Sequence, residues 1–248
     1  MKNILYLLLT LPFLSLAVIA DEVPQAKSQV LWDSWYTVTL NGKVPYGYYH
    51  DRVEKKDGKI AFKNEFWKKE EGFINEEKLV VFAEDNQELT PVLFNFQSSY
   101  RNSKMDIDGN VKERNLIVKP RKDGNELAVI KRNIAKGTFF SSLFPIWVGK
   151  RLSNLKEGKL TSFTTVLEDN LERGYAPVSG NFRVEKADEF AVKNSAKKLA
   201  VNYQDRKSTW YLGPTGETIK ILMHDQNAVV EKTSESIARK FLIQADGL

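Results

Sequence analysis

Residues 35–69, WYTVTLNGKVPYGYYHDRVEKKDGKIAFKNEFWKK, contain the pattern that decides the fold. Short runs of aromatic and β-branched residues alternate there with the turn dipeptides Asn41-Gly42 and Asp57-Gly58. Such dipeptides favour the two-residue turns of β-hairpins, because both of their positions tolerate a positive φ. The segment therefore predicts antiparallel strands at about 34–40, 44–55 and 59–69.

The same alternation of strand and turn continues along the chain. Further turn pairs occur at Asp108-Gly109, Asp123-Gly124 and Thr215-Gly216. We predict the remaining strands at about 73–84, 92–103, 110–119, 125–134, 159–168, 180–187, 197–204, 207–213, 218–224 and 228–232. Because consecutive strands joined by short turns usually pair with each other, the expected topology is one continuous sheet of two similar meanders, over about 33–135 and 159–232.

Apolar residues occupy every second position in several of these strands, which indicates a sheet with one buried face. The positions expected on that face are Ile60, Phe62, Phe66, Val92, Phe94, Phe96, Tyr100, Ile219, Ile221 and Met223. A long, twisted antiparallel sheet with one apolar face must curl over something. The predicted fold is therefore mainly β, with a large curved antiparallel sheet that forms an open barrel or half-barrel.

Two segments are predicted to cover the apolar side of this sheet. Residues 139–153 are dense in apolar side chains but interrupted by Pro145 and Gly149, and we expect a lid or a core plug there. Residues 234–243 predict a short amphipathic C-terminal helix with Thr233 as its N-cap. A plug would fill a dry core, whereas a lid would cover an apolar cavity. The expected lining of that cavity is Phe62, Phe66, Phe94, Phe96, Phe144 and Trp147.

The first twenty residues are typical of a cleaved secretory signal peptide. Lys2 precedes an apolar run over residues 4–16, and Val18 and Ala20 precede the expected cleavage site. The mature protein, residues 21–248, is then expected to be a single β-rich domain in the periplasm, with secretion as the alternative. No later apolar run reaches the length of about 18 residues that a spanning helix needs, so no transmembrane helix is expected in the mature chain.

Composition and motifs argue against nucleic-acid binding, metal binding and catalysis. The 37 Lys and Arg residues are interleaved with 32 Asp and Glu residues, so no basic groove for nucleic acid is expected. The chain has no cysteine, which excludes thiol nucleophiles and thiolate metal sites. His50-Asp51 and His224-Asp225 invite a metal interpretation, but neighbours on a strand point to opposite faces. We therefore expect no enzyme, no metal and no cofactor.

Three segments resemble an uncharacterised family of bacterial periplasmic proteins. Residues 141–144 (SSLF), followed by 150–152 (KRL) and 155–158 (LKEG), resemble the central signature of that family. The opening hairpin at 35–47 and the closing strands at 210–221 resemble its two ends. Such domains are distantly similar in shape to the lipoprotein carriers LolA and LolB, in which a curved sheet embraces an aliphatic ligand. The resemblance implies a lipid or other hydrophobic ligand, while the alternative is a structural envelope protein with a dry core and a protein partner.

Overall fold

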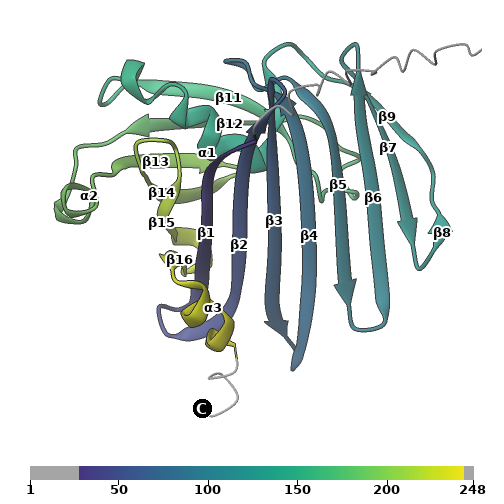
Figure 1. Ribbon diagram of the computed structural model, residues 1–248, viewed down its shortest axis with the longest axis horizontal. Coiled ribbons are helices and arrows are strands. Elements are labelled where there is room, and N and C mark those ends of the chain that lie inside the picture. The colour runs from purple at the N-terminus through teal and green to yellow at the C-terminus, as the bar shows by residue number, and fades with distance from the viewer. Residues whose placement is uncertain (1–27, 243–248) are drawn as a thin grey trace, which may run out of the picture.

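The computed structural model describes residues 28–242, so the predicted signal peptide lies outside the described residues. These residues form one sheet of 16 strands (Figure 1). The first half consists of β1 (Gln29–Leu40), β2 (Val44–Lys56), β3 (Lys59–Glu70), β4 (Phe73–Glu84), β5 (Pro91–Tyr100), β6 (Ser103–Lys112), β7 (Asn115–Lys122), β8 (Asn125–Glu126) and β9 (Ile130–Asn133). The second half consists of β10 (Thr138–Phe140), β11 (Leu160–Val166), β12 (Val178–Val184), β13 (Lys197–Tyr203), β14 (Arg206–Leu212), β15 (Thr218–Met223) and β16 (Ala228–Thr233).

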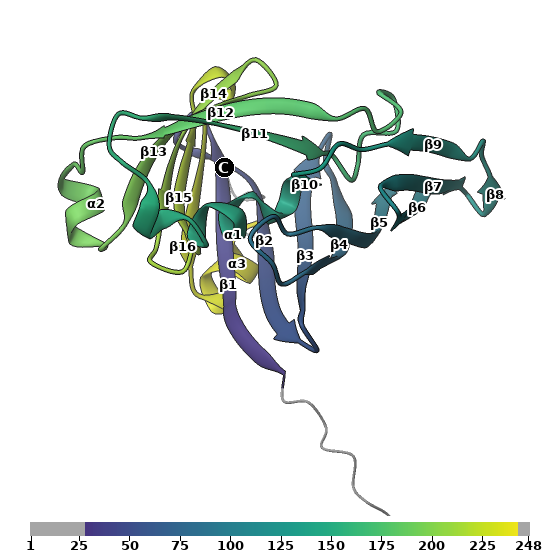
Figure 2. The ribbon, with the colours of Figure 1, turned by 90° about the horizontal axis from the view of Figure 1, so that it is seen from above.

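The sheet is strongly curved and remains open. Its order runs from β10 through β16 to β1 and then on to β8, with β9 beside β7. In Figure 1, β1 to β7 stand side by side and β11 to β14 run across them, and Figure 2 shows the resulting bend from above. The prediction of a mainly β, curved and open sheet is confirmed. It is wrong for one pair, because β10 and β11 are parallel; the chain crosses through residues 141–159 between them, as a parallel connection requires.

The hairpin turns follow the predicted dipeptides at three places. Asn41-Gly42, Asp57-Gly58 and Asp123-Gly124 all have positive φ at both positions, as a two-residue hairpin turn with this twist requires. Thr215-Gly216 also lies in a turn, between β14 and β15, but the prediction of a turn at Asp108-Gly109 is wrong, because these residues lie inside β6. The chain instead turns at 101–102 and at 113–114, where Arg101, Glu113 and Arg114 adopt φ between +50° and +65°.

Gly109 serves the packing of the sheet and not a turn. It lies directly opposite Phe94 of β5, and a Cβ added to it would come 2.5 Å from the Cδ1 atom of the Phe94 ring. The ring therefore occupies the space that any larger side chain at 109 would need. A glycine inside a strand is often the sign of such a close approach.

Residues 28–242 contain three short α-helices, two in connections between strands and one after the last strand. They are α1 (Phe144–Gly149), α2 (Glu189–Lys193) and α3 (Glu235–Phe241), and 3-10 turns occupy Ser141–Leu143, Leu152–Asn154 and His224–Gln226. The C-terminal helix is confirmed, but its N-cap is Ser234 and not Thr233, since the Ser234 hydroxyl accepts a hydrogen bond from the Ile237 N–H. Helix α2 was not predicted, although Asp188 caps it in the same way. No helix among residues 28–242 is long and apolar enough to cross a lipid bilayer.

Alternation along β1 defines the two faces of the sheet. Trp32, Ser34, Tyr36 and Val38 are buried and point to the concave side, which we call the inner face. Trp35 points to the other side, the outer face. In β15, a bulge at residue 219 shifts the alternation between inner and outer side chains by one position. Ile219 therefore packs with Tyr211 on the outer face, against the prediction that it shares a face with Ile221.

Helix α3 covers the outer face and not the inner one. Its Arg239 guanidinium lies 4.6 Å from the centre of the Trp35 ring, and α3 contacts β1 and β2. The prediction that residues 234–243 cover the apolar concave side is therefore wrong. The physical reason is that β1, β2 and β3 carry a second aromatic cluster outside, in which Tyr48 and Trp67 stack at 4.9 Å and Trp35 and Trp67 at 6.3 Å.

Helix α1 lies inside the bend, between the two halves of the sheet (Figure 2). Its Ile146, Trp147 and Val148 are all buried and belong to the main core cluster. The Trp147 ring stacks on Phe139 at 5.1 Å and meets Phe182 edge to face at 6.3 Å. This part of residues 139–153 therefore fills the core of the bend, as a plug does.

Candidate ligand-binding groove

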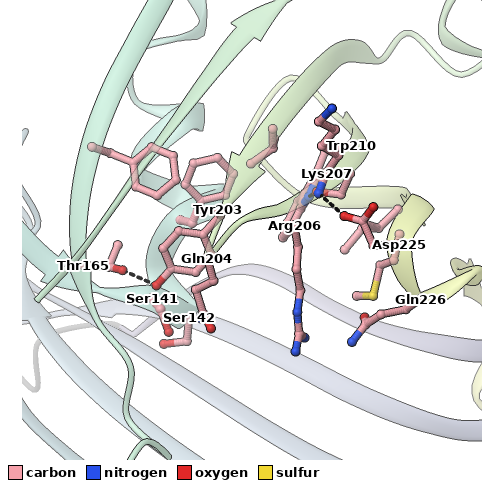
Figure 3. A pocket seen from close by; sticks show the side chains of 16 residues that line it. Ser141, Ser142, Thr165, Tyr203, Gln204, Arg206, Lys207, Trp210, Asp225 and Gln226 are labelled. Atoms are coloured by element: carbon pink, nitrogen blue, oxygen red, sulfur yellow. Dashed lines mark hydrogen bonds between the residues drawn. The ribbon is translucent and has the colours of Figure 1, made fainter. Parts of the chain in front are cut away.

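Two adjoining cavities lie on the inner face, beside α1. The first, of about 260 Å³, is bounded by residues of β11, β13, β14 and β15 (Figure 3). The second, of about 570 Å³, is bounded by residues of β1 to β4 and β14 to β16. The residues that border both cavities are Ser141, Ser142, Trp210, Ile221, Met223 and Gln226. Because the two cavities share these walls, we treat them as one feature and call it the inner groove.

The walls of the second cavity are mainly aromatic and aliphatic. Tyr49 stacks on the buried Tyr36 at 4.6 Å and meets the Phe66 ring edge to face at 6.0 Å. Ile221 and Val230 face them from β15 and β16 as part of the same small cluster. Tyr49 and Phe66 are only partly buried. These side chains are therefore inner-face residues that the core of the protein does not fully cover.

One carboxylate stands among these apolar walls. Asp51 lies two positions from both Tyr49 and Val53 on β2, so its side chain points to the same inner face as theirs. It is the cross-strand partner of Asn64. The Asn64 amide donates a hydrogen bond of 2.7 Å to Asp51. Burial raises the pKa of Asp51 to about 7, although this hydrogen bond acts in the opposite direction. The second cavity therefore contains a group that changes its charge near neutral pH.

A buried glutamate holds the segment between the two cavities. Glu168 is 3% exposed and accepts hydrogen bonds from the hydroxyls of Ser141, at 2.6 Å, and Ser142, at 2.5 Å. It also accepts one from the Ser142 backbone N–H, at 3.1 Å. Burial raises the pKa of Glu168, while the serine hydrogen bonds lower it. Since both hydroxyls donate to this carboxylate, their role here is to anchor the start of α1 to the end of β11.

The hairpin between β13 and β14 forms one edge of the first cavity. Gln204 and Asp205 make its turn with positive φ, and Tyr203 shares a hydrogen bond with Thr165 on the cavity wall. Arg206 is exposed and borders the same cavity. Figure 3 shows its side chain extending away from the hairpin, toward the side where Ser142 and Gln226 lie. The groove thus combines apolar walls with a cation at its edge.

The structure separates the six aromatic residues that were predicted to line a cavity. Phe62 and Phe66 border the second cavity, and Phe144 borders the first. Phe94 is 1% exposed and packs edge to face on Phe140. The Trp147 side chain, which extends from α1, lies in the core. Phe96 borders a separate, more polar hollow together with Glu77 and Asp169. A role in binding stays a prediction for the three that border the groove.

His50 and Asp51 lie on β2 and point to opposite faces, as strand geometry requires, whereas His224 and Asp225 lie in the 3-10 turn after β15. His50 lies on the outer face, with its Nε2 2.5 Å from Asp33 Oδ1, while Asp51 points into the groove. His224 Nε2 lies 2.9 Å from the Thr209 hydroxyl. Within residues 28–242, no three His, Asp or Glu side chains gather as a metal site would require.

Sequence reasoning missed several polar residues of the groove. Asp51 and Asn64 each lie two positions from apolar residues of their own strand, and this spacing could have placed both of them on the inner face. Glu168 carries no such signal, because its partners lie 26 and 27 positions away in the chain. Arg206 was likewise overlooked, since an exposed arginine next to a turn looks like any other surface residue.

Comparisons with known proteins leave the family of this chain open. No protein-family model matches it, and no curated protein matches it either. Among solved structures it is similar to the crystal structure of a DUF1089 family protein from Pseudomonas aeruginosa, at 12% sequence identity and a TM-score of 0.38. That similarity covers 69% of this chain and 87% of the other. At this level it carries no argument about function.

Proposed function

We propose that this protein is a non-enzymatic envelope protein that binds the apolar part of a lipid or another hydrophobic small molecule in the inner groove. The observation that carries the proposal is the pair of adjoining cavities on the inner face. Their volumes, about 260 Å³ and about 570 Å³, compare with the roughly 300–1,000 Å³ that is typical of small-molecule sites. An export route through a signal peptide at residues 1–20 and a periplasmic location belong to the same proposal.

The partial burial of the groove walls supports binding. Tyr46, Tyr49, Phe66, Trp210 and Met223 pack against the small cluster around Tyr36 but remain partly exposed. A ligand that covers such side chains gains about 25 cal/mol for each Å² of apolar surface removed from water. An aliphatic chain laid along the groove would therefore bind through the hydrophobic effect, without any covalent chemistry.

Titration with the neutral fluorescent probe N-phenyl-1-naphthylamine tests this proposal. The full-length mature protein, purified without detergent, is expected to enhance the fluorescence of the probe in a saturable way. Native mass spectrometry of the same sample would reveal a co-purified lipid directly. The site of binding is then located with two substitutions on adjacent residues of β4.

Leu79→Trp and Val80→Trp form a matched pair for that purpose. Leu79 borders the second cavity, whereas Val80 pairs with Lys63 and Asn95 on the outer face. The added indole at 79 occupies space in the groove, so we expect Leu79→Trp to weaken probe binding about 10-fold or more and Val80→Trp to leave it unchanged. If the wild-type protein does not enhance the fluorescence of the probe at any concentration, the proposal is contradicted. That result favours the alternative, a structural protein with a protein partner.

A further inference from the structure

We propose that the ligand of the inner groove is an amphiphile whose anionic head group, a carboxylate or a phosphate, binds to Arg206. This inference rests on the proposed function and specifies the chemical class of its ligand. The apolar chain would lie against Phe144, Trp210, Ile221 and Met223, which border the first cavity together with Arg206. The head group would then remain at the edge of the groove, where Arg206 is exposed to solvent.

Strand geometry directs Arg206, and not its neighbour, to the inner face. Arg206 is the cross-strand partner of Tyr203, whose ring packs against the inner-face Phe163 at 5.5 Å. Lys207 pairs with Asn202 and borders a separate hollow on the outer face, although it also adjoins the first cavity. Figure 3 shows the Arg206 and Lys207 side chains extending from the hairpin in opposite directions.

The charge of Arg206 is not neutralised by the protein. Among residues 28–242, Lys68, Arg121 and Lys232 of the sheet each form an ion pair, but Arg206 forms none. Asp225, which borders the same cavity, already accepts a hydrogen bond of 2.6 Å from the Lys207 backbone N–H. An arginine without a partner at the rim of an apolar cavity is therefore available to an anion.

The chemistry of the rim fits a carboxylate or a phosphate. A guanidinium presents a planar fork of N–H donors that matches both groups. The amides of Gln204 and Gln226 border the same cavity and can add further donors. Arg206 also borders a polar hollow that Glu77, Asp169 and Glu172 line. Because these carboxylates repel an anion, the head group is expected on the side of the guanidinium that faces the first cavity.

Displacement of bound N-phenyl-1-naphthylamine tests this inference. The competitors are dodecanoate, dodecyl phosphate and dodecan-1-ol, which share one chain length, and inorganic phosphate, which has no chain. The variants are Arg206→Gln and Lys207→Gln, which remove the same charge from opposite sides of one strand. For wild-type protein we expect both anionic amphiphiles to displace the probe at lower concentration than the alcohol, and inorganic phosphate to displace none.

Arg206→Gln is expected to weaken competition by dodecanoate and dodecyl phosphate about 5- to 10-fold, as a hydrogen-bonded charge pair near the surface would. The concentration of dodecan-1-ol that displaces the probe is expected to be the same in Arg206→Gln as in the wild type. In Lys207→Gln, every competitor is expected to displace the probe at its wild-type concentration. Equal losses in the two variants, or equal competition by alcohol and acid, overturn the inference but leave the proposed function standing. If neither the neutral probe nor any of the dodecyl compounds binds, both the inference and the proposed function are overturned. Thermal unfolding of each variant checks that the hairpin is intact.

Discussion

The inner face of the sheet has two regions that share a strand pattern but differ in packing. Beneath α1, the side chains of Phe139, Trp147 and Phe182 are at most 6% exposed and pack ring on ring. Beside α1, Tyr49 and Phe66 come from equally regular strands, yet they border a cavity of about 570 Å³. Alternation of polar and apolar residues therefore decides which face is apolar, but not how completely that face is filled.

The length and ending of α1 account for the difference. The helix has only six residues, and its last residue, Gly149, contacts the loop between β14 and β15. Ser141, Ser142, Phe144 and Pro145 are the only residues of the segment 139–153 that border the groove. The plug thus fills the bend at one end and leaves the inner face beyond it open.

The two regions also differ in their polar groups. Aromatic rings pack on Trp147, together with the Arg151 guanidinium, 3.8 Å from the centre of its ring. The groove instead contains Asp51, Asn64 and the serines held by Glu168. A polar group inside a protein is costly unless it is hydrogen-bonded. The plugged region therefore contributes stability through packing, whereas the polar groups beside the groove are held by hydrogen bonds among themselves.

The largest expected effect tests whether the region beneath α1 is a packed core. Trp147→Ala is expected to lower the free energy of unfolding by roughly 3–5 kcal/mol, because it leaves a large cavity among buried rings. Probe binding in the groove is expected to stay as in the wild type, since Trp147 borders neither cavity. Urea unfolding and probe titration measure the two quantities. A small loss of stability together with weaker binding would make this segment a lid and break the comparison.

An intermediate effect is expected at the end of α1. A Cβ added to Gly149 would come 2.8 Å from the Gly216 Cα, and the neighbouring atoms are backbone that cannot rotate away. Gly149→Ala is therefore expected to lower the free energy of unfolding by about 1–3 kcal/mol. Pro145, four residues earlier, borders the second cavity, so a shifted helix would also change probe affinity. Unchanged stability would show that the loop at 213–217 yields freely and does not limit α1.

The smallest of these effects has a magnitude that depends on pH. Because the pKa of Asp51 is about 7 in the folded protein and near 4 when unfolded, folding favours its protonated form. Stability from this group is therefore fully present at low pH and is lost as the pH rises from about 4 to 7. Asp51→Asn is expected to stabilise the protein by about 1–2 kcal/mol at pH 8 and to change little at pH 4.

Asp33→Asn is the control for this experiment. Asp33 lies on the outer face of β1, where partial burial would raise its pKa but hydrogen bonds from His50 and Arg52 outweigh that and lower it. Its stabilising contribution is present above pH 4 and is lost as the pH falls, so Asp33→Asn is expected to destabilise the protein at pH 8. If chemical unfolding across this pH range shows the same sign for both variants, the groove does not raise the pKa of Asp51.

The predicted turns separate what local sequence can decide from what it cannot. Asn41-Gly42, Asp57-Gly58 and Asp123-Gly124 form the turns that their own φ preferences dictate. At 113–114 the chain turns through Glu113 and Arg114, which lack that preference. The pairing of Lys112 with Asn115, at the end of a continuous ladder between β6 and β7, holds them in the turn. That ladder extends well beyond the turn itself, so the few residues around 113–114 do not predict it.

Phe94 and Gly109 give the same lesson for packing. The sequence shows an apolar strand and an Asp-Gly pair, and the pair predicts a turn. Only the sheet shows that the glycine lies under the Phe94 ring of the neighbouring strand, where any larger side chain would collide with it. A residue whose role is to leave space cannot be identified before its neighbour is known.

The sequence by itself determined that this protein is mainly a curved, open β-sheet, that short turns connect most of its strands, and that a small helix follows the last strand. These features depend on neighbours along the chain, which set φ preference and face. Only the tertiary structure decided that α3 covers the outer face, that Glu168 holds Ser141 and Ser142, and that a groove with Asp51 and Arg206 remains beside α1. Those features depend on contacts between residues far apart in the chain, and the curvature of the whole sheet brings such residues together.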